Sequence, residues 1–203
     1  MKQQSVITNR INGTGILNTN TVQENIGDGS STTNLIISSG FTSIGDSAFT
    51  GLGLSGITLP ASLTSIGYRA FKQCLSLTSV SFEPNSQLVI IGEYAFNGCS
   101  VLTSVNFNEL NQLETINKYA FLDSGLSGSI TLPASLTSIG DQAFSRCPLT
   151  SVNFNELNQL ESIGDGAFSN SGLSGTITIP ATVTSIGDTA FFSCSSSFSV
   201  SFE

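Results

Sequence analysis

The chain has 203 residues, with 6 Lys or Arg against 14 Asp or Glu, so its formal net charge at pH 7 is −8. Only 10% of the residues are charged, and there is no His and no Trp. This balance argues against nucleic acid as a partner, because phosphate binding needs clustered Lys and Arg. The lack of His removes the commonest general base and metal ligand. No apolar run is long enough to cross a bilayer, so we expect no membrane insertion.

The first 33 residues differ from the rest of the chain. They begin MKQQSVITNR, without the apolar stretch of a secretory signal, and are rich in Thr, Asn, Gly and Ser. The terminal segments of repeat proteins commonly cover the open end of the core. We therefore interpret residues 1–33 as an N-terminal cap, with a segment that attaches the chain to a larger assembly as the alternative.

From residue 34 onward the sequence repeats itself. The motif Ile-x-x-x-Ala-Phe begins at seven positions that are 22 to 25 residues apart: Ile44, Ile66, Ile91, Ile116, Ile139, Ile163 and Ile186. A period of this length lies within the range of leucine-rich repeats. It predicts a repeat solenoid of the leucine-rich-repeat type over residues 34–203, made of short β-strands and short helical turns, with about seven turns.

Each turn is predicted to contain two strands and a helical turn. The first strand reads Leu-x-x-Val-x-Phe, as at Leu102, Val105 and Phe107, and its alternation indicates one buried face. A second apolar stretch, Leu-Thr-Ser-Ile, follows after a turn. Gly-Asp-x-Ala-Phe then predicts a helical turn, because a carboxylate is favourable at a helix start. The Asp residues at this position are Asp46, Asp141, Asp165 and Asp188.

Two other motif positions predict the core. The motif places one Phe per turn in a buried stack: Phe49, Phe71, Phe96, Phe121, Phe144, Phe168 and Phe191. Each Cys follows its motif Phe by three residues, and the four are Cys74, Cys99, Cys147 and Cys194. Because one repeat position carries them all, we expect buried free thiols. Only Cys74 and Cys99 lie in adjacent turns, so a disulfide between them stays an alternative.

The outward positions of the first strand form the candidate binding surface. They carry hydroxyls and amides and no charge, and solenoids commonly bind ligands on such a concave sheet. The candidate ligand-binding residues are Thr58, Ser79, Ser81, Ser104, Asn106, Ser129, Thr131, Ser151, Asn153, Thr176 and Thr178. The alternative is that these side chains only bond to each other along the sheet, since the surface lacks Tyr, Trp and Arg anchors.

Three further patterns are open to two interpretations. Tyr68, Tyr94 and Tyr119 lie at comparable points of consecutive turns, either as an aromatic strip on the convex side or as half-buried packing. Stacked Asp side chains suggest calcium, but no Asp-x-Asp-x-Asp loop accompanies them, so we expect no metal and no cofactor. Without a His base beside a nucleophile we expect no catalysis.

The segments LTSVNF, ITLPASLTSIGDQAF and AFSRC resemble the BspA-like leucine-rich repeat family, and the resemblance covers residues 35–203. Several members of that family are surface adhesins that bind host matrix proteins or other cells. The resemblance therefore implies a non-catalytic adhesion module at the cell surface or outside the cell, which recognises a protein or glycan on its concave sheet. Asn117-Lys118 departs from the Gly-Asp of the motif, which speaks against a continuous metal ladder.

A structural role is the alternative function, as a component of a virion, phage tail or surface layer. The chain stops at FSVSFE, within the first strand of an eighth turn. We expect either that the natural chain continues or that Phe198, Val200 and Phe202 form a closing strand protected by a partner. Assembly would then use the N-terminal segment or this C-terminal edge strand. Ice binding by the hydroxyl rows is less expected, because the rows mix Ser, Asn and Gly.

Overall fold

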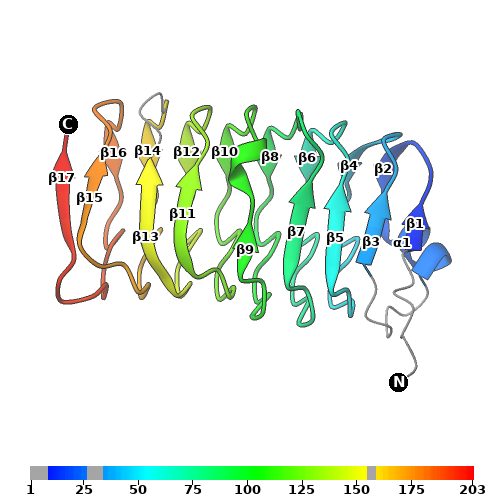
Figure 1. Ribbon diagram of the computed structural model, residues 1–203, viewed down its shortest axis with the longest axis horizontal. Helices are drawn as coiled ribbons and strands as arrows, with labels where there is room; N and C mark the ends of the chain where they lie inside the picture. Colours follow the sequence, from blue (N-terminus) through cyan, green and yellow to red (C-terminus); the bar gives the residue numbers. More distant parts are fainter. Residues whose placement is uncertain (1–8, 27–33, 155–158) are drawn as a thin grey trace, which may run out of the picture.

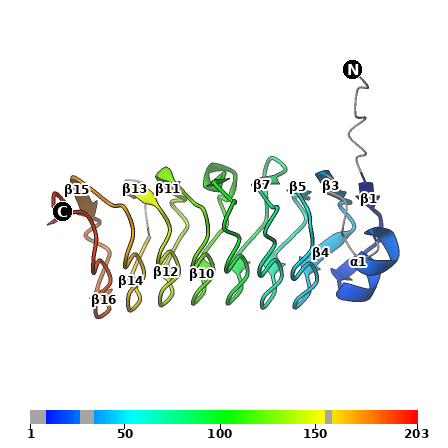
Figure 2. The same ribbon diagram turned by 90° about the horizontal axis from the view of Figure 1, so that it is seen from below.

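The structure, a computed structural model, describes residues 9–26, 34–154 and 159–203. It is a parallel β-solenoid whose turns stack in a nearly straight row (Figures 1 and 2). This confirms the predicted repeat solenoid. The motif count gave seven turns, and residues 9–26 add a further turn that lacks the motif, with two strands that pair to the next turn.

The front face of the solenoid consists of parallel strands, one per turn, in three hydrogen-bonded groups. The first group is β1 (Asn9–Ile11), β3 (Asn34–Ile37), β5 (Gly56–Leu59), β7 (Ser79–Phe82) and β9 (Ser104–Val105). The second is β11 (Gly128–Leu132) with β13 (Leu149–Phe154), and the third is β15 (Thr176–Ile179) with β17 (Ser199–Phe202). After β9 the chain forms a 3-10 helix, η1 (Phe107–Glu109), because the Asn106 side chain accepts a hydrogen bond from the Asn108 N–H and bends the backbone.

The back sheet is continuous and contains eight parallel strands among the described residues. They are β2 (Gly15–Leu17), β4 (Phe41–Ile44), β6 (Ser65–Ile66), β8 (Ile90–Ile91), β10 (Thr115–Ile116), β12 (Ser138–Ile139), β14 (Ser162–Ile163) and β16 (Ser185–Ile186). The pairing aligns the first Ile of each motif with that of the next turn, as in Ile116 with Ile139.

The helix α1 (Thr19–Ile26) lies at the N-terminal end of the row (Figure 1). Its Val22 side chain is fully buried in the core. At the helix start, the side-chain oxygen Oδ1 of Asn18 accepts a hydrogen bond from the Thr21 N–H. Residues 1–8 and 27–33 lie outside the described residues. The interpretation of residues 1–33 as a cap or an attachment segment therefore stays a prediction.

A column of Phe rings runs through the core, as the motif predicts. The rings from Phe49 to Phe191 stack with centroids 4.8 to 5.6 Å apart and interplanar angles of 1 to 6°. This separation is close to the spacing of hydrogen-bonded strands, so one ring per turn fills the core without a gap. The six rings from Phe49 to Phe168 are fully buried, and Phe191 is partly buried.

A second column in the core is made by the cysteines, which are all free. The Sγ–H of Cys74 donates a hydrogen bond to the Phe49 carbonyl oxygen of the preceding turn at 3.0 Å. Cys99 and Cys147 make the same contact, also at 3.0 Å, to Phe71 and Phe121. Burial raises the pKa of Cys147 to about 12, so the thiol keeps the proton that this contact needs.

The seven segments that follow the motif strands, which we call the Ala-Phe turns, differ from expectation because they are not helical. Two residues in each segment have positive φ, which ends a helical run. The first, just before the motif Ala, has φ of 51 to 59° and the second, four residues later, has φ of 54 to 71°. They are Ser47, Arg69, Tyr94, Tyr119, Gln142, Gly166 and Thr189, followed by Gly51, Gln73, Gly98, Asp123, Arg146, Asn170 and Ser193.

The Asp residues of the motif therefore do not start helices. Oδ1 of Asp46 accepts a hydrogen bond from the Tyr68 N–H of the next turn at 2.8 Å. Asp165 accepts one from the Asp188 N–H at 2.8 Å in the same way. Each carboxylate thus supplies a partner to a backbone donor of the neighbouring turn, which stabilises the stacking of turns.

Replacing Phe121 by Ala is predicted to lower the free energy of unfolding by about 3–5 kcal/mol, because it leaves a cavity between two stacked rings. Chemical denaturation would measure the change. Phe192→Ala is the matched control, since the Phe192 ring is 62% exposed, and should change stability by about 0.5 kcal/mol or less. A loss below about 1 kcal/mol for Phe121→Ala would contradict the buried stack.

The buried thiols are predicted to resist alkylation in the folded protein. At pH 8, iodoacetamide should label the half-buried Cys194 before Cys74, Cys99 and Cys147, and all four in denaturant, as read by peptide mass spectrometry. Equal labelling of Cys147 and Cys194 in the native protein would contradict this burial.

The raised pKa of Cys147 also makes the free energy of unfolding fall as the pH rises from 9.0, the ordinary pKa of a Cys thiol, toward 12. In this range only the unfolded chain loses the thiol proton.

Candidate functional site

The structure places the candidate residues in rows on the front face. Strand pairing aligns Ser79 with Ser104, Thr58 with Ser81, and Thr131 with Asn153. Buried and outward residues alternate along β7, where Val80 and Phe82 point into the core. Nine of the eleven candidate side chains are exposed, and Thr58 and Ser151 are half-buried. The period-two pattern was therefore sufficient for the candidate residues that lie on strands. It was wrong at Asn106, which was expected on a strand with Phe107 but caps η1 just after β9.

The hydrogen bonds of these side chains differ between the two halves of the front face. In the C-terminal half they link neighbouring strands, with Ser151 Oγ and Asn153 Nδ2 each donating to Ser129 Oγ at 2.9 Å. The Thr176 and Ser199 hydroxyls form a similar pair at 2.8 Å. Here the side chains bond to each other along the sheet, as the alternative interpretation expected.

In the N-terminal half the same kind of side chain has no such partner. Among the residues that the structure describes, the hydroxyls of Thr58, Ser79, Ser81 and Ser104 make no side-chain hydrogen bond. These hydroxyls are exposed or half-buried beside the sheet. They are therefore available to donate to, and accept from, a bound molecule.

The front face carries two hollows. One, of about 320 Å³, lies over β3, β5 and β7 and is lined by Thr58, Ser79 and Ser81. Gly56 also lines it, and a Cβ there would lie 2.6 Å from Asn34 Oδ1 and 3.2 Å from Ser79 Oγ, so a larger residue would crowd the hollow. Sequence reasoning did not select Asn34, because this residue precedes the first motif.

The second hollow, of about 160 Å³, lies where β9 ends and η1 begins, next to β11. It is lined by Ser104, Asn106, Ser129 and Thr131, all of them candidate residues, and by Asn108. The sequence did not predict the hollow itself, since it arises from the bend that Asn106 and Asn108 make in the backbone.

Two properties of the front face limit what it can bind. The residues that line its hollows include no charged side chain, so it offers hydrogen bonds and small apolar contacts. The turns form a nearly straight row in both views (Figures 1 and 2), so the face is flat rather than the concave inner side of a horseshoe. A flat surface with uncharged hollows suits an extended polar partner better than a small charged ligand.

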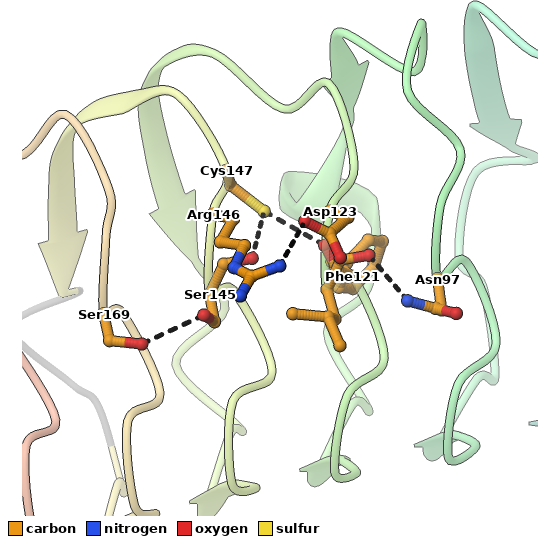
Figure 3. Close-up of polar contacts among 8 residues, drawn as sticks. Asn97, Phe121, Asp123, Ser145, Arg146, Cys147 and Ser169 are labelled. Atoms are coloured by element: carbon orange, nitrogen blue, oxygen red, sulfur yellow. Dashed lines mark hydrogen bonds and ion pairs between the residues drawn. The ribbon is translucent and has the colours of Figure 1, made fainter.

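Charged side chains of the repeats gather instead on the Ala-Phe turns. Lys118 Nζ lies 2.8 Å from Asp141 Oδ2. The hydrogen bond between them lowers the pKa of Asp141 and raises the pKa of Lys118. Arg146 Nη1 lies 3.5 Å from Asp123 Oδ1 one turn away (Figure 3). Both pairs connect adjacent turns at the surface, where such contacts contribute little to stability.

The three tyrosines also lie on the Ala-Phe turns and pack against each other. The Tyr94 and Tyr119 rings stack with centroids 4.7 Å apart, and Tyr68 meets Tyr94 edge-on at 6.0 Å. The Arg69 guanidinium lies over the Tyr68 ring at 4.6 Å, and Lys72 Nζ lies 5.4 Å from the Tyr94 centroid. Partial burial, together with Tyr119, raises the pKa of Tyr94. The rings cover each other, which favours packing over a free aromatic platform.

No three His, Cys, Asp or Glu side chains among the described residues come close enough together to hold a metal ion. The same residues contain no helix with the length and apolar character needed to cross a membrane.

Comparison with known proteins identifies relatives of this solenoid. No curated protein matches the chain. A leucine-rich cell-surface protein from Faecalibacterium prausnitzii is 29% identical with a TM-score of 0.59, over 84% of this chain and 48% of the other. A leucine-rich repeat protein from Bacteroides ovatus is 31% identical with a TM-score of 0.65, over 75% and 39%. The pneumococcal vaccine antigen PcpA shares the fold, at 24% identity and a TM-score of 0.56, over 95% and 44%.

The chain thus spans less than half the length of each of these three structures. A family model for the BspA type leucine rich repeat region, in six copies, matches residues 20–128 and 114–203. These matches cover the motif turns, the stacked Phe column and both hollows of the front face. The chain belongs to the BspA-type leucine-rich repeat family.

Proposed function

We propose that the chain is a non-catalytic binding module, displayed at a cell surface, that recognises a protein or a glycan through its front face. The observation that carries this proposal is the pair of uncharged hollows, which are lined by hydroxyl and amide side chains on a flat sheet. The cell-surface relative from Faecalibacterium prausnitzii supports the location.

The chemistry of the hollows favours a neutral, polar partner. Thr58, Ser79 and Ser81 present donors and acceptors at strand spacing along the solenoid, and each is free to bond to a ligand. A single hydroxyl contributes little net free energy, so binding would depend on many contacts made together along the row. An extended peptide or a glycan chain that lies along the row of turns provides such contacts.

The proposal predicts that a large charged side chain in either hollow reduces binding. Ser81→Arg and Thr131→Arg each fill one hollow and place a cation on an uncharged surface. Binding of labelled protein to cultured epithelial cells, and to the matrix they leave after removal, should fall about tenfold or more, because the blocked contacts and the buried charge both weaken the complex.

Thr184→Arg is the matched control, since Thr184 is exposed beside β16 of the back sheet and distant in sequence from both hollows. This variant should bind like the unaltered protein. Equal binding by all three variants would refute recognition through the front face. Failure to bind at all, together with ordered assemblies in analytical ultracentrifugation, would favour the structural-component alternative.

A further inference from the structure

A third hollow lies away from the front face, on the Ala-Phe turns near β14 and β16. Its volume is about 300 Å³, and its lining includes Gln142, Arg146, Asp165, Asn170 and Phe192. All of these residues belong to three successive Ala-Phe turns, and none belongs to a front strand. The hollow is therefore distinct from the surface on which the proposed function depends.

The hollow exists because one turn lacks a side chain where its neighbours have one. The positive-φ position before the motif Ala carries Tyr119 and Gln142 in the two preceding turns, Gly166 here, and Thr189 in the next turn. A Cβ on Gly166 would lie 3.2 Å from Gln142 Cγ and 3.3 Å from Ser169 Oγ. The absent side chain leaves a gap between the Gln142 and Thr189 positions.

The floor of the gap is a buried hydrogen bond. The Ser145 and Ser169 hydroxyls lie 2.9 Å apart, and both residues are buried, at 2% and 8% exposure (Figure 3). Two buried hydroxyls that are satisfied by each other form a rigid polar base with acceptor capacity to spare.

The polar walls keep most of their hydrogen-bonding capacity. Within the described part of the chain, the side-chain amides of Gln142 and Asn170 form no hydrogen bond. Asp165 uses Oδ1 to accept from the Asp188 N–H, and Oδ2 has no partner among the described residues. Arg146 makes one long contact to Asp123 at 3.5 Å. Two amides, a carboxylate oxygen and a guanidinium thus surround the hollow with free donors and acceptors.

One wall is aromatic. The Phe192 ring lines the hollow, where the equivalent position in the two preceding turns holds Ser145 and Ser169. The core does not explain a large apolar ring here, because Phe191 already supplies the stacked ring of this turn. Phe192 thus supplies an apolar wall beside the polar groups of Gln142 and Asn170, a combination that ligand pockets commonly have.

We propose that this hollow binds one pyranose ring of a neutral saccharide. A pyranose has an apolar C–H face, which would pack on Phe192, and a rim of hydroxyls, which pair with planar amide and carboxylate groups. The volume lies at the low end of ligand pockets, at about 300 Å³, which suits one ring. Arg146 and Asp165 have opposite charges, so the site does not favour a strongly anionic ligand such as a phosphate.

The experiment is saturation-transfer-difference NMR with a panel of methyl glycosides of glucose, galactose, mannose, fucose and N-acetylglucosamine. At least one should receive saturation from the protein, with a dissociation constant of about 1 mM, as expected for a ligand of this size in a shallow site. Gly166→Gln should weaken that binding at least tenfold, because it fills the hollow with the residue that the preceding turn carries at the same position and a similar φ. Phe192→Ala should also weaken it, by removing the aromatic wall.

Gly51→Gln is the matched control. Gly51 also has positive φ, the next turn carries Gln73 at the equivalent position, and a Cβ on Gly51 meets nothing within 4 Å. This variant should keep full binding, and circular dichroism should show that all variants are folded. Absence of saturation transfer with every glycoside would overturn the proposal, as would binding that Gly166→Gln leaves unchanged. Thr131→Arg on the front face should not alter glycoside binding, so the proposal for this hollow and the proposed function can be refuted independently.

Discussion

The stacking of turns in register is the constraint on which the rest of this structure depends. Parallel pairing along the back sheet sets each motif Ile beside the motif Ile of the next turn. Every other position is then also aligned with its equivalents, at about the 4.8 Å strand spacing. The Phe column, the Cys contacts to Phe carbonyl oxygens and the Asp contacts to the next backbone N–H all follow from this alignment.

The same alignment divides the surface into two chemically different faces. From β5 onward the described front strands repeat small hydroxyls and amides and carry no charged side chain, whereas Arg10 on β1 places one charge at the N-terminal end of the face. The Ala-Phe turns allow each turn a different residue at two positive-φ positions, and they carry Arg69, Lys72, Lys118 and Arg146. Where one turn carries Gly at a position at which neighbouring turns carry a larger residue, as at Gly56 on the front face or Gly166 on the Ala-Phe turns, a hollow forms at the surface and the core is unchanged.

Much of the fold was predictable from the sequence, because burial in a solenoid follows the repeat. The alternation in β7 and the positions of Phe121 and Cys147 were sufficient to place each of them correctly. The Ala-Phe turns were not predicted correctly. Because Asp is favourable at a helix start, the sequence predicted a helical turn in each of these segments. The two positive-φ positions of each segment, such as Gly98 or Asn170, are only weakly indicated by the residue types found there. The hollows were not predictable, since each depends on which side chains lie in adjacent turns or on one local bend at Asn106.

The register of the front strands can be measured directly in solution. With Thr58→Cys and Ser81→Cys in one chain, dibromobimane should cross-link the pair and become fluorescent, because these residues are aligned partners on the outer side of β5 and β7. The pair Thr58→Cys and Asn106→Cys, two turns apart, should remain unlinked, and the buried thiols of Cys74, Cys99 and Cys147 should not react. The account predicts cross-linking of the first pair alone. Absence of cross-linking between positions 58 and 81, with the protein folded, would contradict the register that aligns both faces.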